Sequence, residues 1–99
     1  MGNPKFALPS LESLLESKHE VKAIVSNPAK PMGRKRVLKH TDVGSYSLQN
    51  NIELIELDSF NNDTIYKKLL SLNVDIFVVV AFRILPEKYI SIPKFGSIN

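Results

Sequence analysis

The chain has 99 residues, 43% of them hydrophobic and 23% charged, a composition typical of one small globular domain and unlike a disordered segment. It has no cysteine, which excludes disulfides and thiolate chemistry, and no apolar run approaches the roughly 20 residues of a membrane span. The net charge is +3, yet five of the 13 Lys and Arg lie in residues 30–40, where no acidic residue occurs. A basic excess confined to one segment favours a docking point for phosphates over general solubility.

The first half of the chain alternates between helical and strand patterns. Apolar residues recur at helical spacing over 5–17, with Pro9 in or near the first turn, where its missing N–H costs little. Residues 21–25 form a short β-branched run that predicts a strand. A weak helix is expected over 43–50, capped by Thr41 or Asp42, and a strand over 52–57.

The second half continues the alternation. A helix is expected over 63–72, capped by Asn61 or Asn62. The run IFVVVA at 76–81 is apolar at every position, which predicts a strand covered on both faces, as in a parallel sheet. Pro86 starts a short helix, and residues 96–99 open a last strand. This order predicts an open α/β sheet.

Both ends of the pattern look incomplete. An α/β chain normally opens with a strand, whereas this one begins with the turn MGNP and runs directly into a helix. We therefore expect residues 1–99 to be part of one domain, without its first strand and its C-terminal part. The first strand would be central in a doubly wound sheet, so its place is expected to be vacant. Because the backbone groups on either side would then be buried without partners, the isolated chain is expected to fold poorly.

The basic segment NPAKPMGRKRVLKH contains Pro28, Pro31 and Gly33, which discourage regular structure and predict a protruding loop. Arg binds phosphate through a bidentate fork and Lys acts as a point charge, so contact with a folded nucleic-acid backbone is one interpretation. A merely solvated basic loop is the other, and the residues alone do not separate the two.

The segment VVVAFRILP leaves the apolar run and enters a turn, at the end of a strand where open α/β sheets bind ligands. Phe82 and Ile84 either wall a flat aromatic ligand or, with Leu85, belong to the core. His19 and His40 have no partner at ligand spacing, so no metal site is expected. No serine triad or carboxylate pair can be identified.

Taken together, MGNPKFALPSLESLLESKHEV, NPAKPMGRKRVL and VVVAFRILPEKYISIPKFGSIN resemble, in order and spacing, the N-terminal part of methionyl-tRNA formyltransferases. That family has M-G-T-P-x-F-A at its first turn, a P-x-x-P-x-G-R loop, V-V-A-(Y/F) leading to I-L-P, and a G-x-I-N strand. The resemblance spans essentially the whole chain, although AFRILP is one residue shorter than the common AYGxILP.

The resemblance implies a Rossmann-like formyltransferase domain that transfers a formyl group from 10-formyltetrahydrofolate to methionine on initiator tRNA. Asn99 matches the catalytic Asn, expected to hydrogen-bond the formyl oxygen as charge develops, while the catalytic His and Asp would lie outside residues 1–99. The folate would lie near the turn, and the basic loop would contact the tRNA. The residues so assigned are Phe82, Arg83, Ile84 and Leu85 for the folate, and Lys30, Arg34, Lys35 and Arg36 for the tRNA.

The resemblance further implies a cytoplasmic enzyme, monomeric at full length, with no metal and no membrane partner, of which this chain alone would be inactive. The rivals are formyltransferases acting on glycinamide ribonucleotide or a nucleotide sugar, which lack the combination of GNPKFA with the P-x-x-P-x-G-R loop. A non-catalytic RNA-binding module is a further alternative, but it leaves the turn at 82–85 and Asn99 unexplained.

Overall fold

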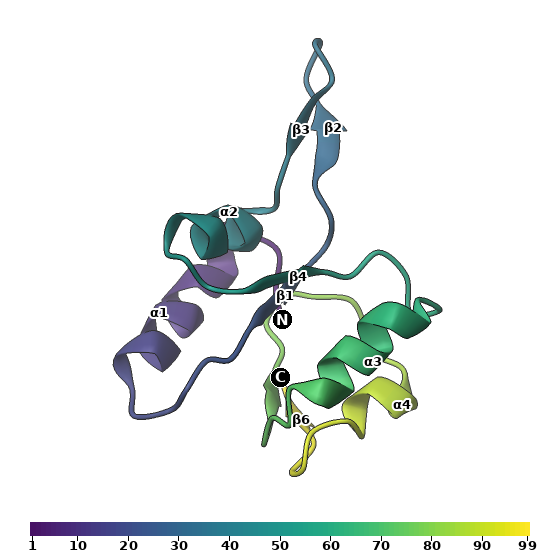
Figure 1. Ribbon diagram of the computed structural model, residues 1–99. Helices are drawn as coiled ribbons and strands as arrows, with labels where there is room; N and C mark the ends of the chain where they lie inside the picture. Colours follow the sequence, from purple (N-terminus) through teal and green to yellow (C-terminus); the bar gives the residue numbers. More distant parts are fainter.

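The computed structural model describes all residues from 1 to 99, and its helices alternate with short strands (Figure 1). No helix is both long and apolar enough to cross a bilayer. In chain order the elements are a 3-10 turn η1 (Lys5–Ala7), α1 (Leu8–Glu16), β1 (Ile24–Ser26), β2 (Lys30–Met32), β3 (Val37–Lys39), α2 (Asp42–Gln49), β4 (Leu54–Glu56), α3 (Asp63–Ser71), β5 (Phe77–Val78), α4 (Glu87–Ile90) and β6 (Ser97–Ile98).

The strands of the main body are parallel and form two pairs with the N-terminus between them. β1 pairs with β4, and β5 pairs with β6. The Gly2 N–H donates to the Val25 carbonyl at 3.0 Å, while Gly2 also forms a parallel bridge with Val80. The order across the body is therefore β4, β1, the segment 1–2, β5, β6, which confirms the prediction of an α/β fold with a parallel sheet.

The central position of this sheet is only partly vacant, which corrects the expectation that it would be empty. Met1 and Gly2 occupy its carboxyl end, where β1 and the segment after β5 approach closely. A Cβ added at Gly2 would lie 2.7 Å from the Val80 carbonyl oxygen and 3.0 Å from the Ala7 Cβ. Only glycine fits this close approach, so the turn MGNP serves as the last residues of a strand as well as the entry to α1.

The helices cover the two faces of the sheet, with α1 and α2 on one side and α3 and α4 on the other (Figure 1). Side chains that alternate along β1 contribute to different clusters, Ile24 to the first and Val25 to the second. The first cluster comprises Ala7, Leu11, Ile24 and Val43, and the second Val25, Ile55, Leu57, Leu69, Phe77, Val79, Leu85 and Tyr89.

Side-chain caps decide where two of the helices begin. The Thr41 hydroxyl accepts from the Gly44 N–H at 2.9 Å, and the Asn62 side-chain oxygen accepts from the Ile65 N–H at 3.1 Å. Each satisfies a backbone donor that has no partner within its helix. Thr41 rather than Asp42, and Asn62 rather than Asn61, is thus the capping residue, and α4 begins directly after Pro86 as expected.

The expectation that residues 76–81 would be covered on both faces is wrong. Phe77 and Val79 are buried in the larger core cluster, but Val78 and Val80 are only half-buried and Ile76 is exposed. The side of the strand that carries the even-numbered residues borders an open groove. One face of this apolar run is therefore packed in the core, and the other face is only partly covered by residues 1–99.

Candidate functional site

A small pocket of about 230 Å³ lies where β5 and β6 end. Carboxyl ends of parallel strands are the usual ligand-binding edge of open α/β sheets. The pocket brings together all five residues that the sequence assigned to catalysis and folate binding. They are Phe82, Arg83, Ile84, Leu85 and Asn99, joined at the wall by Val79, Ile90, Ser97 and Ile98.

The turn that forms one wall of the pocket has free main-chain groups. Residues 82–85 make no backbone–backbone hydrogen bond, so their N–H and C=O groups are available to a ligand. Ala81, just before them, has φ 50°, the left-handed conformation that reverses the chain. A flat heterocycle with donors and acceptors along its edge is the kind of ligand that such a turn can bind.

The side chains of the turn divide between pocket and core. Ile84 is 95% exposed, Phe82 is half-buried, and Leu85 is buried in the larger core cluster. Of the two interpretations left open by the sequence, Ile84 fits the ligand wall and Leu85 fits the core. Leu85 lines the pocket as well, but most of its side chain is packed in the core.

Arg83 lines the pocket, and its guanidinium also holds the turn in place. Its guanidinium donates to the carbonyl oxygens of Leu57 and Asp58, the latter at 3.1 Å. The guanidinium carbon also lies 4.8 Å from the ring centre of Phe60 and 5.1 Å from that of Phe82. Arg83 thus ties the turn after β5 to the loop after β4, across the ligand-binding edge of the sheet.

The support beneath Arg83 was not anticipated from the sequence. Tyr89 is fully buried, its hydroxyl donates to the Phe60 carbonyl oxygen at 3.2 Å, and its ring meets that of Phe60 edge-on at 5.1 Å. Burial raises the pKa of the Tyr89 hydroxyl, so the group stays a neutral donor at physiological pH. No local pattern in EKYI marks this tyrosine, since its partner is 29 residues away.

Asp58 lies beside this support on the surface. Its carboxylate accepts from the Asn62 side chain at 3.1 Å and from the Ser59 N–H at 2.7 Å. These hydrogen bonds, the one from Asn62 foremost, lower the pKa of the Asp58 carboxyl. The loop that receives Arg83 is therefore itself ordered by hydrogen bonds.

The basic segment is a hairpin rather than the irregular loop that was expected. β2 and β3 pair antiparallel, with Lys30 opposite Lys39 and Pro31 opposite Leu38, and the Arg36 N–H donates to the Gly33 carbonyl at 3.2 Å to close the turn. Pro31 is tolerated because both strands of a two-stranded hairpin are edge strands. The hairpin protrudes from the body, as predicted (Figure 1).

All the predicted tRNA-binding residues of the hairpin are exposed: Lys30, Arg34, Lys35 and Arg36. Neither of the two ion pairs of the molecule involves them, since these join His40 to Glu56 and Lys68 to Glu53. Lys30 and Lys39 are directly opposite one another, an unfavourable arrangement in a free hairpin. An uncompensated concentration of positive charge of this kind suits a polyanionic partner.

The hairpin and the pocket are separate features. The hairpin is anchored at its base, where the His40 Nδ1 lies 2.6 Å from the Glu56 carboxylate at the end of β4. The structure contains no group of three or more His, Asp or Glu side chains arranged to hold a metal ion. The arrangement thus provides one small pocket beside free main-chain groups and one basic arm.

Comparison with known proteins agrees with this geometry. The family model described as formyl transferase matches residues 1–99. The chain is 45% identical over 102 residues to a methionyl-tRNA formyltransferase of Ehrlichia chaffeensis, covering 100% of the chain and 34% of that protein. It is 38% identical over 100 residues to the enzyme of the same name from Enterococcus faecalis, covering 100% of the chain and 32% of that protein.

A third relative, from Sulfurihydrogenibium sp., has the same name and is 42% identical over 100 residues, 99% of this chain and 32% of that protein. The chain thus spans about a third of the length of the curated relatives it matches. Because the family model matches from the first residue to the last, the chain belongs to the formyl transferase family.

Proposed function

We propose that the chain contributes the donor pocket and a tRNA-contacting arm to an enzyme that formylates methionine on initiator tRNA, with 10-formyltetrahydrofolate as donor. The observation that carries this proposal is the pocket at the ends of β5 and β6. It joins Asn99 to the turn 82–85, two segments that the sequence separates and that the resemblance assigns to one reaction.

The free main-chain groups of residues 82–85 fit the heterocycle of a folate, which has donors and acceptors along one edge. Phe82 and Ile84 supply the apolar surface beside them. The pocket, at about 230 Å³, is smaller than the roughly 300–1,000 Å³ of typical ligand sites. The remaining walls would come from the rest of the longer enzyme.

The folate supplies the formyl group, and the residue of this chain that would act on it is Asn99. Asn99 is exposed at the end of β6, where its side-chain amide can donate to the formyl oxygen. As the amino group of methionine attacks the formyl carbon, negative charge collects on that oxygen, and a fixed donor stabilises it. The proton-transfer residues would lie outside residues 1–99.

The hairpin provides the attraction for the tRNA. Lys30, Arg34, Lys35 and Arg36 extend from the body on a narrow arm with no acidic neighbour, which suits contact with phosphates of a folded RNA. Arg34 lies in the turn at the tip, the part that reaches farthest. We further propose that the complete enzyme acts as a cytoplasmic monomer.

The experiment that tests the proposal is a comparison of acceptors with the full-length enzyme that contains this chain. We expect formylation of methionyl initiator tRNA, and none of glycinamide ribonucleotide or of an amino nucleotide sugar, when 10-formyltetrahydrofolate is the donor. Transfer to one of the small acceptors in preference to tRNA would contradict the proposal. Binding of tRNA without any transfer would favour the non-catalytic alternative.

A further inference from the structure

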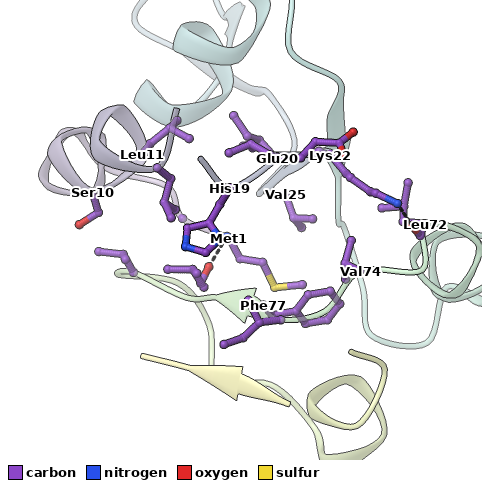
Figure 2. A pocket seen from close by; sticks show the side chains of 18 of the residues that line it. Met1, Ser10, Leu11, His19, Glu20, Lys22, Val25, Leu72, Val74 and Phe77 are labelled. Carbon is purple, nitrogen blue, oxygen red and sulfur yellow. Dashed lines mark hydrogen bonds between the residues drawn. The ribbon is translucent and has the colours of Figure 1, made fainter. Parts of the chain in front are cut away.

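The basic hairpin has no packing of its own against the body. All residues from 30 to 39 are exposed, and none belongs to either core cluster. The largest cavity, a groove of about 600 Å³ between β1 and β5, has no lining residue from the hairpin either (Figure 2). A two-stranded ribbon without a packed face is only marginally ordered. The direction in which the hairpin extends therefore depends on the contacts at its base.

Asn3 joins the two chain segments that flank the hairpin. Its side-chain oxygen accepts from the Asn27 N–H at 2.7 Å, and its main-chain carbonyl accepts from the Val43 N–H at 3.0 Å. These contacts fix where the chain leaves the body and where it returns. Asn27 and Val43 both lie outside β2 and β3, however, so the contacts of Asn3 do not fix the direction of the hairpin itself.

The contact that can fix this direction is made by His40, the residue that directly follows β3. Between residues 28 and 40, the only hydrogen bond to the rest of the molecule joins the His40 Nδ1 to the Glu56 carboxylate, at 2.6 Å. An ionised carboxylate can only accept, so the Nδ1 atom carries the hydrogen in this contact. Glu56 is the last residue of β4, so the contact ties the hairpin to the end of a sheet strand.

The two residues after Glu56 hold the turn of the pocket. The carbonyl oxygens of Leu57 and Asp58 accept from the Arg83 guanidinium, which belongs to the turn 82–85. Three consecutive residues thus anchor both features, the hairpin through one side chain and the turn through two carbonyls. The position of the hairpin relative to the pocket is therefore set at residues 56–58.

We propose that His40 and Glu56 are positioning residues for the tRNA, because their contact holds the hairpin in one direction relative to the pocket. This inference rests on the proposed function of the hairpin as the arm that contacts tRNA. An arm already held in its binding direction loses less conformational freedom when the tRNA binds. The same positive charges should therefore bind tRNA more tightly on a fixed arm than on a mobile one.

The negative charge of Glu56 separates positioning from simple electrostatics. A carboxylate beside a basic arm repels phosphates, so Glu56→Ala would tighten tRNA binding if Glu56 acted through its charge alone. The positioning role predicts the opposite sign. Because the side chains of His40 and Glu56 are 38% and 32% exposed, their contact is partly screened by solvent. We therefore expect a moderate effect, a rise of roughly two- to fivefold in the KM for tRNA with kcat unchanged.

Steady-state kinetics of the full-length enzyme, with 10-formyltetrahydrofolate and methionyl initiator tRNA, tests this role. Glu56→Ala and His40→Leu should each raise the KM for tRNA, and the double variant should be no worse than either single variant, because the contact is already lost. His40→Gln keeps a side-chain N–H donor and should restore most of the affinity. An unchanged or lower KM in Glu56→Ala, or additive effects in the double variant, would overturn the proposal.

Glu53→Ala is the matched control for the loss of a carboxylate. Glu53 directly precedes β4 and pairs with Lys68 of α3 at 2.9 Å, so it belongs to the other ion pair of the molecule and does not contact the hairpin. This change should leave the KM for tRNA unaltered. A rise as large as that of Glu56→Ala would assign the effect to the general loss of an ion pair beside β4 and would overturn the proposal.

The direction of the hairpin can be measured independently of any activity. Spin labels at Met32→Cys on β2 and Lys67→Cys on α3, both exposed positions, report the distance between arm and body in the full-length enzyme. Residues 1–99 contain no cysteine, and any other cysteine is replaced by serine. Glu56→Ala should widen the distribution of distances, whereas Glu53→Ala should not. Equal distributions in the two variants would overturn the proposal.

The two measurements together distinguish this inference from the proposed function. If the wild-type enzyme does not formylate tRNA, the proposed function fails, and the spin-label distances still decide whether the contact between His40 and Glu56 holds the arm. A wider distribution of distances in Glu56→Ala with an unchanged KM for tRNA would overturn the positioning role alone.

Discussion

Arg83 and Asp58 are 25 residues apart in the sequence, yet the Arg83 guanidinium donates to the Asp58 carbonyl oxygen at 3.1 Å. Together with the bond to Leu57, this contact joins the loops that follow β4 and β5. The turn 82–85 is therefore held by its own arginine. Its conformation depends on the hydrogen bonds that the Arg83 side chain makes to the neighbouring loop.

We predict that Arg83→Met, which keeps much of the stem and removes the guanidinium, lowers the free energy of unfolding by about 2 kcal/mol. Hydrogen bonds to charged groups contribute about 1.5–3 kcal/mol, and part of the Arg83 side chain is exposed. Urea denaturation of the full-length enzyme measures the change. Arg34→Met at the tip of the hairpin is the control and should leave stability within about 0.5 kcal/mol.

If Arg83 positions the turn, Arg83→Met should also weaken folate binding more than it weakens tRNA binding. Equilibrium binding of each substrate to the same variant separates the two effects. An unchanged free energy of unfolding together with unchanged folate affinity would show that the clamp is incidental.

The capped helices and the parallel sheet were predictable because their signals are local. The choice between Asn61 and Asn62 was not, since both residue types cap helices and only the bond to Ile65 decides it. The hairpin was missed because Pro31 and Gly33 are typical loop residues, and an edge strand tolerates them. The sequence did contain one signal for the hairpin, the short run Val37–Lys39 that follows the turn at Gly33.

For the candidate site, the sequence predicted a turn at 82–85 and a role for Asn99, which line one pocket, but it did not predict what holds the turn. The contacts from Arg83 to Leu57 and from Tyr89 to Phe60 link residues 26 and 29 positions apart. The hydrophobic periodicity of the sequence does not predict such contacts, because they depend on how β4 and β5 are placed in the sheet. The role of Arg83 as a clamp was therefore visible only in three dimensions.

The buried Met1 amine predicts a pH dependence of stability for the chain that begins at this residue. Burial lowers the pKa of the amine from 8.0 to about 6, so between these values the unfolded state binds more protons than the folded state. Stability should therefore rise with pH from about 6 to 8, by about 2–3 kcal/mol in total, and fall again as pH drops through that window. Chemical denaturation at a series of pH values measures it.

Acetylation of the Met1 nitrogen is the control, because it removes the titrating group and keeps an N–H donor. The acetylated chain should be more stable at pH 6 and should lose most of the rise between pH 6 and 8. A rise that is identical before and after acetylation would show that groups other than the Met1 amine cause it.

Gly2→Ala tests the close approach at the centre of the sheet. A Cβ at this position meets the Val80 carbonyl oxygen at 2.7 Å, and main chain cannot move aside without breaking the adjacent bonds. We expect a loss of about 1–3 kcal/mol in the free energy of unfolding. A neutral effect in urea denaturation would mean that the segment 1–2 is not packed between its neighbours.

The positive charges of the hairpin are expected to strengthen tRNA binding and to have no effect on folate binding. In the full-length enzyme, Arg34→Ala is expected to raise the KM for charged tRNA several-fold and to reduce the salt slope of tRNA binding by roughly 1, without changing folate affinity. Lys67→Ala is the matched control, because it also removes one positive charge. Lys67 is an exposed residue of α3 outside both sites, so this change should leave tRNA binding and folate binding unaltered. Equal loss of folate and tRNA binding in the Arg34 variant would refute the separation of hairpin and pocket.

The most direct test of the proposed function is the rate of formyl transfer by the full-length enzyme with Asn99→Ala, measured with saturating 10-formyltetrahydrofolate and methionyl initiator tRNA. If Asn99 donates to the developing oxyanion, kcat should fall about 100- to 1,000-fold while the affinity for folate stays within about threefold. Asn61→Ala, which removes an exposed asparagine outside the pocket, should leave both unchanged. A full catalytic rate in the Asn99→Ala enzyme would contradict the account.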